Sequence, residues 1–277
     1  MPLAEVNGTR LYYEESGDPN GEVVIFSHGL LMSLEMFAAQ TAALAARGYR
    51  VIAFDWRGQG HSEAGGDETA YGMDGLAADA WQLLRALGVT SCHWAGLSMG
   101  GMVAFRLFFA QPALFRSLIL LDTSADAELP ERVARYEQMG ITYQQMGPVE
   151  PLMQALPHIF FSPATIANQP ELVARWVEHW KTLRRDVMPW VEGGVDRRSS
   201  VVDRVAGITV PTLIIVGRDD AATPLPRSEQ LHELIAGSRL VVIPDAGHSS
   251  SVEQPEAVTA AIVAFLDELR AASQPVG

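Results

Sequence analysis

The stretch 93–101 reads HWAGLSMGG and places one serine, Ser98, between Gly96 and Gly100. The apolar residues before Ser98 are typical of a buried strand, and residues 99–111 have the apolar spacing of a helix. A strand that turns at once into a helix needs small residues beside the turn, because a side chain there would collide with neighbouring strands. The stretch therefore predicts a strand–turn–helix unit that lifts the Ser98 hydroxyl above the edge of a sheet.

The rest of the chain alternates between similar strands and helices. Apolar, β-branched runs that we interpret as buried strands occur within 22–29, 50–58, 91–98, 116–123, 211–220 and 238–248. Helical apolar patterns occur at 35–48, 73–88, 99–112, 227–237 and 255–272. This order implies an α/β fold with right-handed crossovers and a mostly parallel central sheet flanked by helices. Residues 9–17 are interpreted as an antiparallel start to that sheet.

Residues 126–200 break this rhythm. They contain no convincing buried strand and carry helical patterns, several prolines and three of the six tryptophans. We therefore expect a helical cap, or lid, at 126–200, placed over the carboxyl edge of the sheet. The core domain is then formed by 1–125 and 201–277.

Composition excludes several classes of partner. The chain has 277 residues, 48% of them hydrophobic, and a net charge of −13 without clusters of Lys and Arg. This suits a large buried core and argues against nucleic acid or an anionic membrane surface as partner. No apolar run approaches the ~20 residues of a membrane helix and no secretory signal is recognised, so we expect a cytoplasmic protein. Cys92 is the single cysteine, which excludes an internal disulfide, and no Cys/His cluster predicts a metal site.

A serine nucleophile needs a base within hydrogen-bond reach and an acid that orients the base. Asp219 and Asp220 follow one late strand, and His248 follows the next. Ligands in open α/β sheets bind at the carboxyl ends of the strands, so these side chains are candidates for one site with Ser98. Asp122, at the end of the strand within 116–123, is a rival for the role of the acid.

Five segments of the chain, in this order and in this strand context, resemble the α/β-hydrolase superfamily over nearly the whole length. They are SHGL at 27–30, FDWRGQGHS at 54–62, GLSMGG at 96–101, VGRDDAATP at 216–224 and AGHSSSVEQPE at 246–256. The order serine, acid, histidine is also the order of that superfamily. The resemblance implies an α/β-hydrolase fold with a helical cap insertion.

The resemblance also implies roles for particular residues. In the superfamily pattern, Gly217 and Pro224 frame Asp220, which favours Asp220 over Asp122 as the acid. The oxyanion hole is expected from the backbone N–H groups of Leu30 and Met99.

The implied activity is hydrolysis of a carboxylic ester or lactone through an acyl-enzyme on Ser98, with no metal and no cofactor. The motifs are most similar to 3-oxoadipate enol-lactonases and related small esterases, including N-acyl homoserine lactone lactonases. A cofactor-free perhydrolase of the haloperoxidase type and a non-enzymatic ligand receptor on the same fold are the alternatives. The partner is a small-molecule ester or lactone, and the sequence predicts no oligomeric state.

Four apolar residues are candidates for the substrate pocket. Leu31 and Met32 follow the His-Gly pair and suit an acyl wall, although core packing is an equal interpretation. Trp176 and Trp180 fall on one helical face of the cap. That face would pack against the core domain, line the pocket, or do both.

The remaining histidines have structural interpretations. We expect His28 to hold the oxyanion loop in shape, His93 to make hydrogen bonds inside its strand, and His61 to anchor a loop. His158, His179 and His232 lie in no motif and are expected at the surface or in packing. Asp55 and Arg57 are expected to form an ion pair that supports the neighbouring loops.

Overall fold

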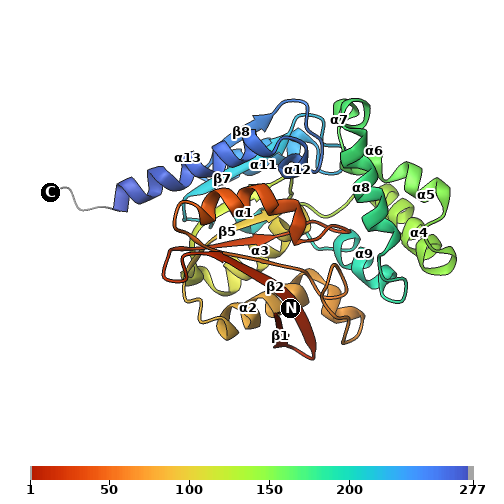
Figure 1. Ribbon diagram of the computed structural model, residues 1–277, viewed down its shortest axis with the longest axis horizontal. Helices are drawn as coiled ribbons and strands as arrows, with labels where there is room; N and C mark the ends of the chain where they lie inside the picture. Colours follow the sequence, from red (N-terminus) through yellow and green to blue (C-terminus); the bar gives the residue numbers. More distant parts are fainter. Residues whose placement is uncertain (1, 274–277) are drawn as a thin grey trace.

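A computed structural model describes residues 2–273 and shows one eight-stranded sheet in the order β1-β2-β4-β3-β5-β6-β7-β8 (Figure 1). The strands are β1 (Leu3–Val6), β2 (Thr9–Gly17), β3 (Val23–Ser27), β4 (Arg50–Phe54), β5 (Cys92–Leu97), β6 (Phe115–Leu121), β7 (Thr212–Gly217) and β8 (Arg239–Ile243). Strand β2 pairs antiparallel with both β1 and β4, and the pairs from β4–β3 to β7–β8 are parallel. The predicted α/β fold with its antiparallel start is confirmed.

Helices cover both faces of the sheet. They are α1 (Ala38–Ala45), α2 (Met73–Ala86), α3 (Met99–Ala110), α10 (Val202–Val205), α11 (Leu225–Leu234), α12 (Ser250–Glu253) and α13 (Pro255–Ser273). Three short 3-10 helices join them: η1 (Leu34–Phe37), η2 (Glu68–Tyr71) and η3 (Pro112–Leu114).

The alternation of side chains within β3 shows why its sequence is apolar at successive positions. Ile25 belongs to the core formed with α2, α3 and α11. Val24 and Phe26 point to the other face and belong to the core formed with α1 and α13. A parallel strand buried on both faces needs such a continuous apolar run, because neither face meets water.

The chain leaves the sheet between β6 and β7. It forms α4 (Pro130–Met146), α5 (Glu150–Ala155), α6 (Pro157–Phe160), α7 (Pro163–Asn168), α8 (Pro170–Lys181) and α9 (Met188–Asp196). These helices gather at one end of the molecule, on the right of Figure 1. Proline stands at the first or second position of each, where the missing N–H would be unpaired anyway. The division into a cap at 126–200 and a core domain stays our proposal.

No helix within residues 2–273 is long and apolar enough to cross a membrane. Within the same residues, no three His, Cys, Asp or Glu side chains are grouped so that they could hold a metal ion.

Candidate active site

Ser98 occupies the turn between β5 and α3. Its backbone has φ 51° and ψ −113°, in the left-handed half of conformational space that residues with side chains rarely adopt. Its N–H donates to the Leu121 carbonyl, and its own carbonyl accepts from the N–H groups of Gly101 and Met102. The neighbouring strand and the first turn of α3 therefore hold the strained residue in place.

The glycines around Ser98 are required by close contacts. A Cβ atom on Gly96 would lie 2.4 Å from the Gly100 carbonyl carbon, and one on Gly100 would lie 2.1 Å from the Ser27 carbonyl oxygen. Both neighbours are backbone atoms and cannot rotate away. The motif around Ser98 thus has the tight strand–helix packing that its spacing predicts.

The structure brings His248 and Asp220 to Ser98. The His248 Nε2 atom lies 2.8 Å from the Ser98 Oγ atom. The His248 Nδ1 atom lies 3.0 Å from each carboxylate oxygen of Asp220. The arrangement requires the proton on Nδ1, because a carboxylate is an acceptor only, and this leaves Nε2 free to accept from Ser98. All three residues are buried.

The loop after β7 fixes the Asp220 carboxylate. One oxygen accepts from the backbone N–H groups of Ala222 and Thr223, at 2.8 and 2.9 Å. The other accepts from the Thr223 hydroxyl at 2.8 Å. These bonds hold the carboxylate in one orientation, in which it faces His248.

Asp122 lies at the end of β6 and points elsewhere. Its carboxylate accepts from the Gly217 N–H at 2.7 Å and from the Ser250 hydroxyl at 2.5 Å. Burial and the charge of Asp220 raise the pKa of Asp122 well above its ordinary value. Among the described residues, Asp122 forms no hydrogen bond or ion pair with His248. The side chain links β7 to α12 and does not orient the imidazole.

Two backbone donors near Ser98 have no hydrogen-bond partner among the described residues. Across residues 2–273, neither the Leu30 N–H nor the Met99 N–H forms a hydrogen bond with the protein. The next N–H, of Leu31, donates to the Gln59 side chain at 2.8 Å, and Leu31 has φ 60°. That bond turns the loop and leaves the Leu30 N–H unpaired beside the pocket, as an oxyanion hole requires.

His28 fixes the loop that carries the Leu30 N–H. Its Nε2 atom accepts from the Trp56 backbone N–H at 3.0 Å, and its carbonyl accepts from the Trp56 indole at 3.0 Å. Burial lowers the pKa of His28, so the ring is neutral and can accept. His93 bonds Ser117 inside the sheet at 2.8 Å, and burial lowers its pKa to about 4.

The predicted ion pair between Asp55 and Arg57 is wrong. Arg57 pairs with Asp79 of α2 through two bonds of 2.7 Å, with both side chains buried. Asp55 accepts from the backbone N–H groups of Leu34 and His61, each at 2.8 Å. Asp55 and Arg57 are only two residues apart, but their side chains bond to different parts of the protein.

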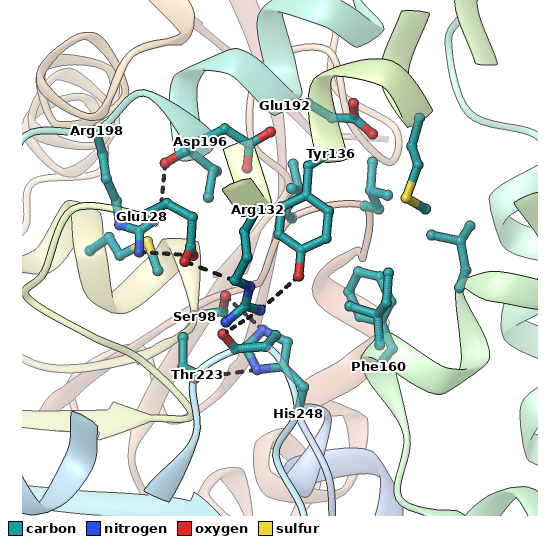
Figure 2. A pocket seen from close by; sticks show the side chains of 18 residues that line it. Ser98, Glu128, Arg132, Tyr136, Phe160, Glu192, Asp196, Arg198, Thr223 and His248 are labelled. Carbon is teal, nitrogen blue, oxygen red and sulfur yellow. Dashed lines mark hydrogen bonds and ion pairs between the residues drawn. The ribbon is translucent and has the colours of Figure 1, made fainter. Parts of the chain in front are cut away.

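A pocket opens above Ser98 and His248 and holds about 620 Å³ of space, part of it open to solvent. Its apolar walls are Leu30, Leu31, Met102, Met139, Leu156, Ile159, Phe160, Val195 and Ala222. Figure 2 shows Tyr136, Arg132, Glu192 and Asp196 reaching into it from α4 and α9. These four polar residues and Phe160 are ones that sequence reasoning missed.

Leu31 lines the pocket, whereas Met32, Trp176 and Trp180 are not among its lining residues. Trp180 is fully buried with its ring centroid 5.1 Å from that of Phe160. The Phe160 ring in turn lies 6.0 Å from the His248 ring. Trp180 therefore packs behind the wall, which is one of the arrangements that its helical spacing allowed.

The polar residues of the wall are of two kinds: some form ion pairs with each other, and some do not. Glu128 lies between the guanidinium groups of Arg132 and Arg198, at 3.7 and 3.4 Å (Figure 2). Glu192 and Asp196 have no such partner in the described chain. Burial and the Asp196 charge raise the pKa of Glu192 well above its ordinary value, and burial raises that of Asp196 to about 7.

Comparison with known proteins agrees with this architecture. A sequence model of the alpha/beta hydrolase fold family matches residues 22–155, and one described as TAP-like protein matches 188–274. A protein named as a carbamate hydrolase, RutD of Azorhizobium caulinodans, is 30% identical, with 97% of this chain and 99% of that protein covered. The chain belongs to the α/β-hydrolase family.

Two solved structures show the same likeness. An esterase from Thermogutta terrifontis, solved with malate bound, superposes with a TM-score of 0.89 at 29% identity, covering 97% of this chain and 99% of its own. The enol-lactonase from Burkholderia xenovorans superposes with a TM-score of 0.88 at 29% identity, covering 96% and 100%. The protein is thus a hydrolase related to esterases, enol-lactonases and carbamate hydrolases.

Proposed function

We propose that the protein hydrolyses carboxylic esters or lactones through an acyl-enzyme on Ser98. The observation that carries this proposal is the continuous hydrogen-bonded series from Asp220 through His248 to the Ser98 hydroxyl. The hydroxyl ends this series at the floor of a pocket with apolar walls, where an acyl group can lie.

In the proposed first step, His248 Nε2 takes the Ser98 proton while Ser98 Oγ bonds to the carbonyl carbon. The carbonyl oxygen becomes an oxyanion and accepts from the N–H groups of Leu30 and Met99. The carbon–oxygen bond to the alcohol then breaks, and the imidazolium gives its proton to the leaving oxygen. In a lactone, this alcohol stays attached to the acyl group.

Water completes the cycle. His248 Nε2 takes a proton from water as the water oxygen bonds to the acyl carbon, and the bond to Ser98 Oγ breaks as the proton passes to it. The acid product leaves and Ser98 is restored. Asp220 keeps its charge throughout and stabilises the imidazolium form of His248.

The proposal is tested with p-nitrophenyl esters of graded acyl length, N-acyl homoserine lactones and larger lactones, including an enol-lactone. We expect multiple turnovers on members of this panel, and a fall of at least about 10⁴-fold in kcat in Ser98→Ala. Ser200→Ala is the matched control, because Ser200 is exposed and outside the pocket.

Two results would contradict the proposal. One is stoichiometric binding without turnover across the whole panel, which is the behaviour of a receptor. The other is turnover in Ser98→Ala equal to that of the wild type. Formation of peroxyacid from acetate and peroxide at a rate far above ester hydrolysis would instead favour a perhydrolase.

A further inference from the structure

Helix α9 carries two carboxyl side chains into the pocket above Ser98. Glu192 and Asp196 are one helical turn apart, are only 7% and 4% exposed, and both line the pocket with Ser98 and His248. Figure 2 shows them across the pocket from Ser98 and His248, beyond Arg132 and Tyr136.

In the part of the chain that the structure describes, neither carboxyl forms a hydrogen bond or an ion pair. Within residues 2–273, the Glu192 Oε2 and Asp196 Oδ2 atoms are buried without a hydrogen bond. The nearby Arg198 donates to the carbonyls of Asp126 and Val195 and to Glu128. Buried polar groups are nearly always hydrogen-bonded, so this pair needs an explanation.

The position of the Glu192 carboxyl indicates which side is available to a ligand. A Cβ atom on Gly140 of α4 would lie 1.8 Å from Oε2 but 3.5 Å from Oε1. Oε2 is therefore pressed against α4, and Oε1 lies farther from that helix. Glu192 also lines a small apolar space beyond the pocket, and Leu31, Met139 and Leu156 are walls of both. The carboxyl thus stands where the two spaces meet.

The charge around Glu192 decides what it can bind. Burial and the neighbouring carboxyl favour its uncharged form, which carries one O–H donor and one carbonyl acceptor. Arg132 and Arg198 line the same pocket, but Glu128 lies between them, so neither forms an ion pair with Glu192. A neutral group with a strong acceptor, such as an amide carbonyl, can pair with this O–H at no cost in buried charge.

We propose that the Glu192 carboxyl is a binding site for an amide group in the acyl part of the substrate. The amide carbonyl accepts from the carboxyl O–H at Oε1, the oxygen that lies farther from α4. This inference rests on the proposed ester or lactone hydrolysis and narrows it to amide-bearing acyl groups.

The experiment compares pairs of p-nitrophenyl esters. One member of each pair is the ester of N-acetyl-β-alanine, N-acetyl-4-aminobutanoate or N-acetyl-5-aminopentanoate. In its partner, two methylene groups replace the C(=O)–NH unit. The readout is the ratio of kcat/KM for the amide ester to that for the alkyl ester, so a general change in activity cancels.

We expect the wild type to prefer the amide ester at one or more of the three positions. Glu192→Leu lowers that ratio about tenfold, the effect of losing one hydrogen bond in a buried site. Glu192→Gln keeps it within about threefold, because an uncharged amide side chain is also a donor and an acceptor. Glu171→Leu, the same change at an exposed position of α8, leaves the ratio at the wild-type value.

Three results overturn the inference: an unchanged ratio in Glu192→Leu, an equal loss in Glu192→Gln, or no preference in the wild type. An equal loss in Glu192→Gln, together with wild-type preference for a trimethylammonium-butanoate ester, would show an ionised carboxylate that binds cations. Failure of the proposed ester hydrolysis would look different from failure of this inference, because the wild type would then turn over neither member of any pair. Glu192→Leu removes an unpaired buried carboxyl, so its melting temperature should match or exceed that of the wild type.

Discussion

The strained backbone at Ser98 is the residue-scale feature on which the account depends. A left-handed conformation at a residue with a side chain costs about 1–3 kcal/mol and persists only where the surroundings enforce it. Here the enforcing contacts are the Leu121 carbonyl and the close approach of Gly100 to Ser27. The strain keeps the Ser98 hydroxyl 2.8 Å from His248.

Asp220 and Asp122 provide the residue-scale prediction. Asp220→Asn should lower kcat about 10⁴-fold, because the amide cannot fix the His248 tautomer or stabilise its charged form. Asp122→Asn should lower kcat less than about tenfold and reduce the free energy of unfolding by about 1–3 kcal/mol, through the bonds to Gly217 and Ser250. Single-turnover kinetics and urea unfolding of both variants measure these effects. The assignment fails if Asp122→Asn abolishes turnover while Asp220→Asn stays near the wild type.

At the residue scale, the sequence predicted side-chain contacts best where a motif fixes the backbone conformation. The frame of Gly217 and Pro224 singled out Asp220, and the structure places that carboxylate against His248. The prediction failed for Asp55 and Arg57, because closeness along the chain does not say which way a loop side chain points. Arg57 instead reaches Asp79 of α2, and only the tertiary fold decides that contact.

Helix α9 is the element that brings unpaired carboxyls to the pocket. Its apolar face holds Met188, Val191 and Val195, and Glu192 and Asp196 are buried beside them. A carboxyl within an otherwise apolar helical pattern is the sequence signal that could have indicated a buried acidic residue here. The pattern alone could not show that the pocket, and not solvent, lies on that side.

Asp196 gives the element-scale prediction, which concerns pH. In the unfolded chain its carboxyl loses a proton near pH 4, whereas burial raises the pKa in the folded protein to about 7. Between these two pH values the folded state binds more protons than the unfolded state. The contribution of Asp196 to the free energy of unfolding therefore falls as pH rises. The destabilisation of the folded state by Asp196 is absent below about pH 4. It reaches on the order of 4 kcal/mol above pH 7.

Asp196→Asn removes this destabilisation. The variant should therefore exceed the wild type in melting temperature by more at pH 8 than at pH 4, as measured by calorimetry. Asp267→Asn, an exposed change on α13, should show the same small difference at both values. An advantage of Asp196→Asn that does not grow with pH would contradict the prediction.

Helix α8 shows the limit of periodicity at the element scale. The spacing of Trp176 and Trp180 predicted a buried face, and both side chains are buried. It could not say what covers that face. In the structure Phe160 of α6 stands between Trp180 and His248, so the short helix and not the tryptophan-bearing one reaches the pocket.

At the scale of the whole molecule, the sheet brings distant segments to one edge. The ends of β5, β7 and β8 carry Ser98, Asp220 and His248, and the sheet order places β5 and β7 on either side of β6. The apolar strands and short crossovers predicted this arrangement, because buried parallel strands have few alternatives. The pocket walls were less predictable, since they come from several short helices packed at one end of the sheet (Figure 1).

The central claim is that Ser98 carries the covalent intermediate, and labelling with a fluorophosphonate tests it most directly. The account predicts one adduct per chain, located on Ser98 by mass spectrometry of the digested protein, with loss of ester hydrolysis in step with labelling. Prior incubation with a good substrate should slow the labelling. An adduct on another residue, or full ester hydrolysis after Ser98 is labelled, would contradict the account.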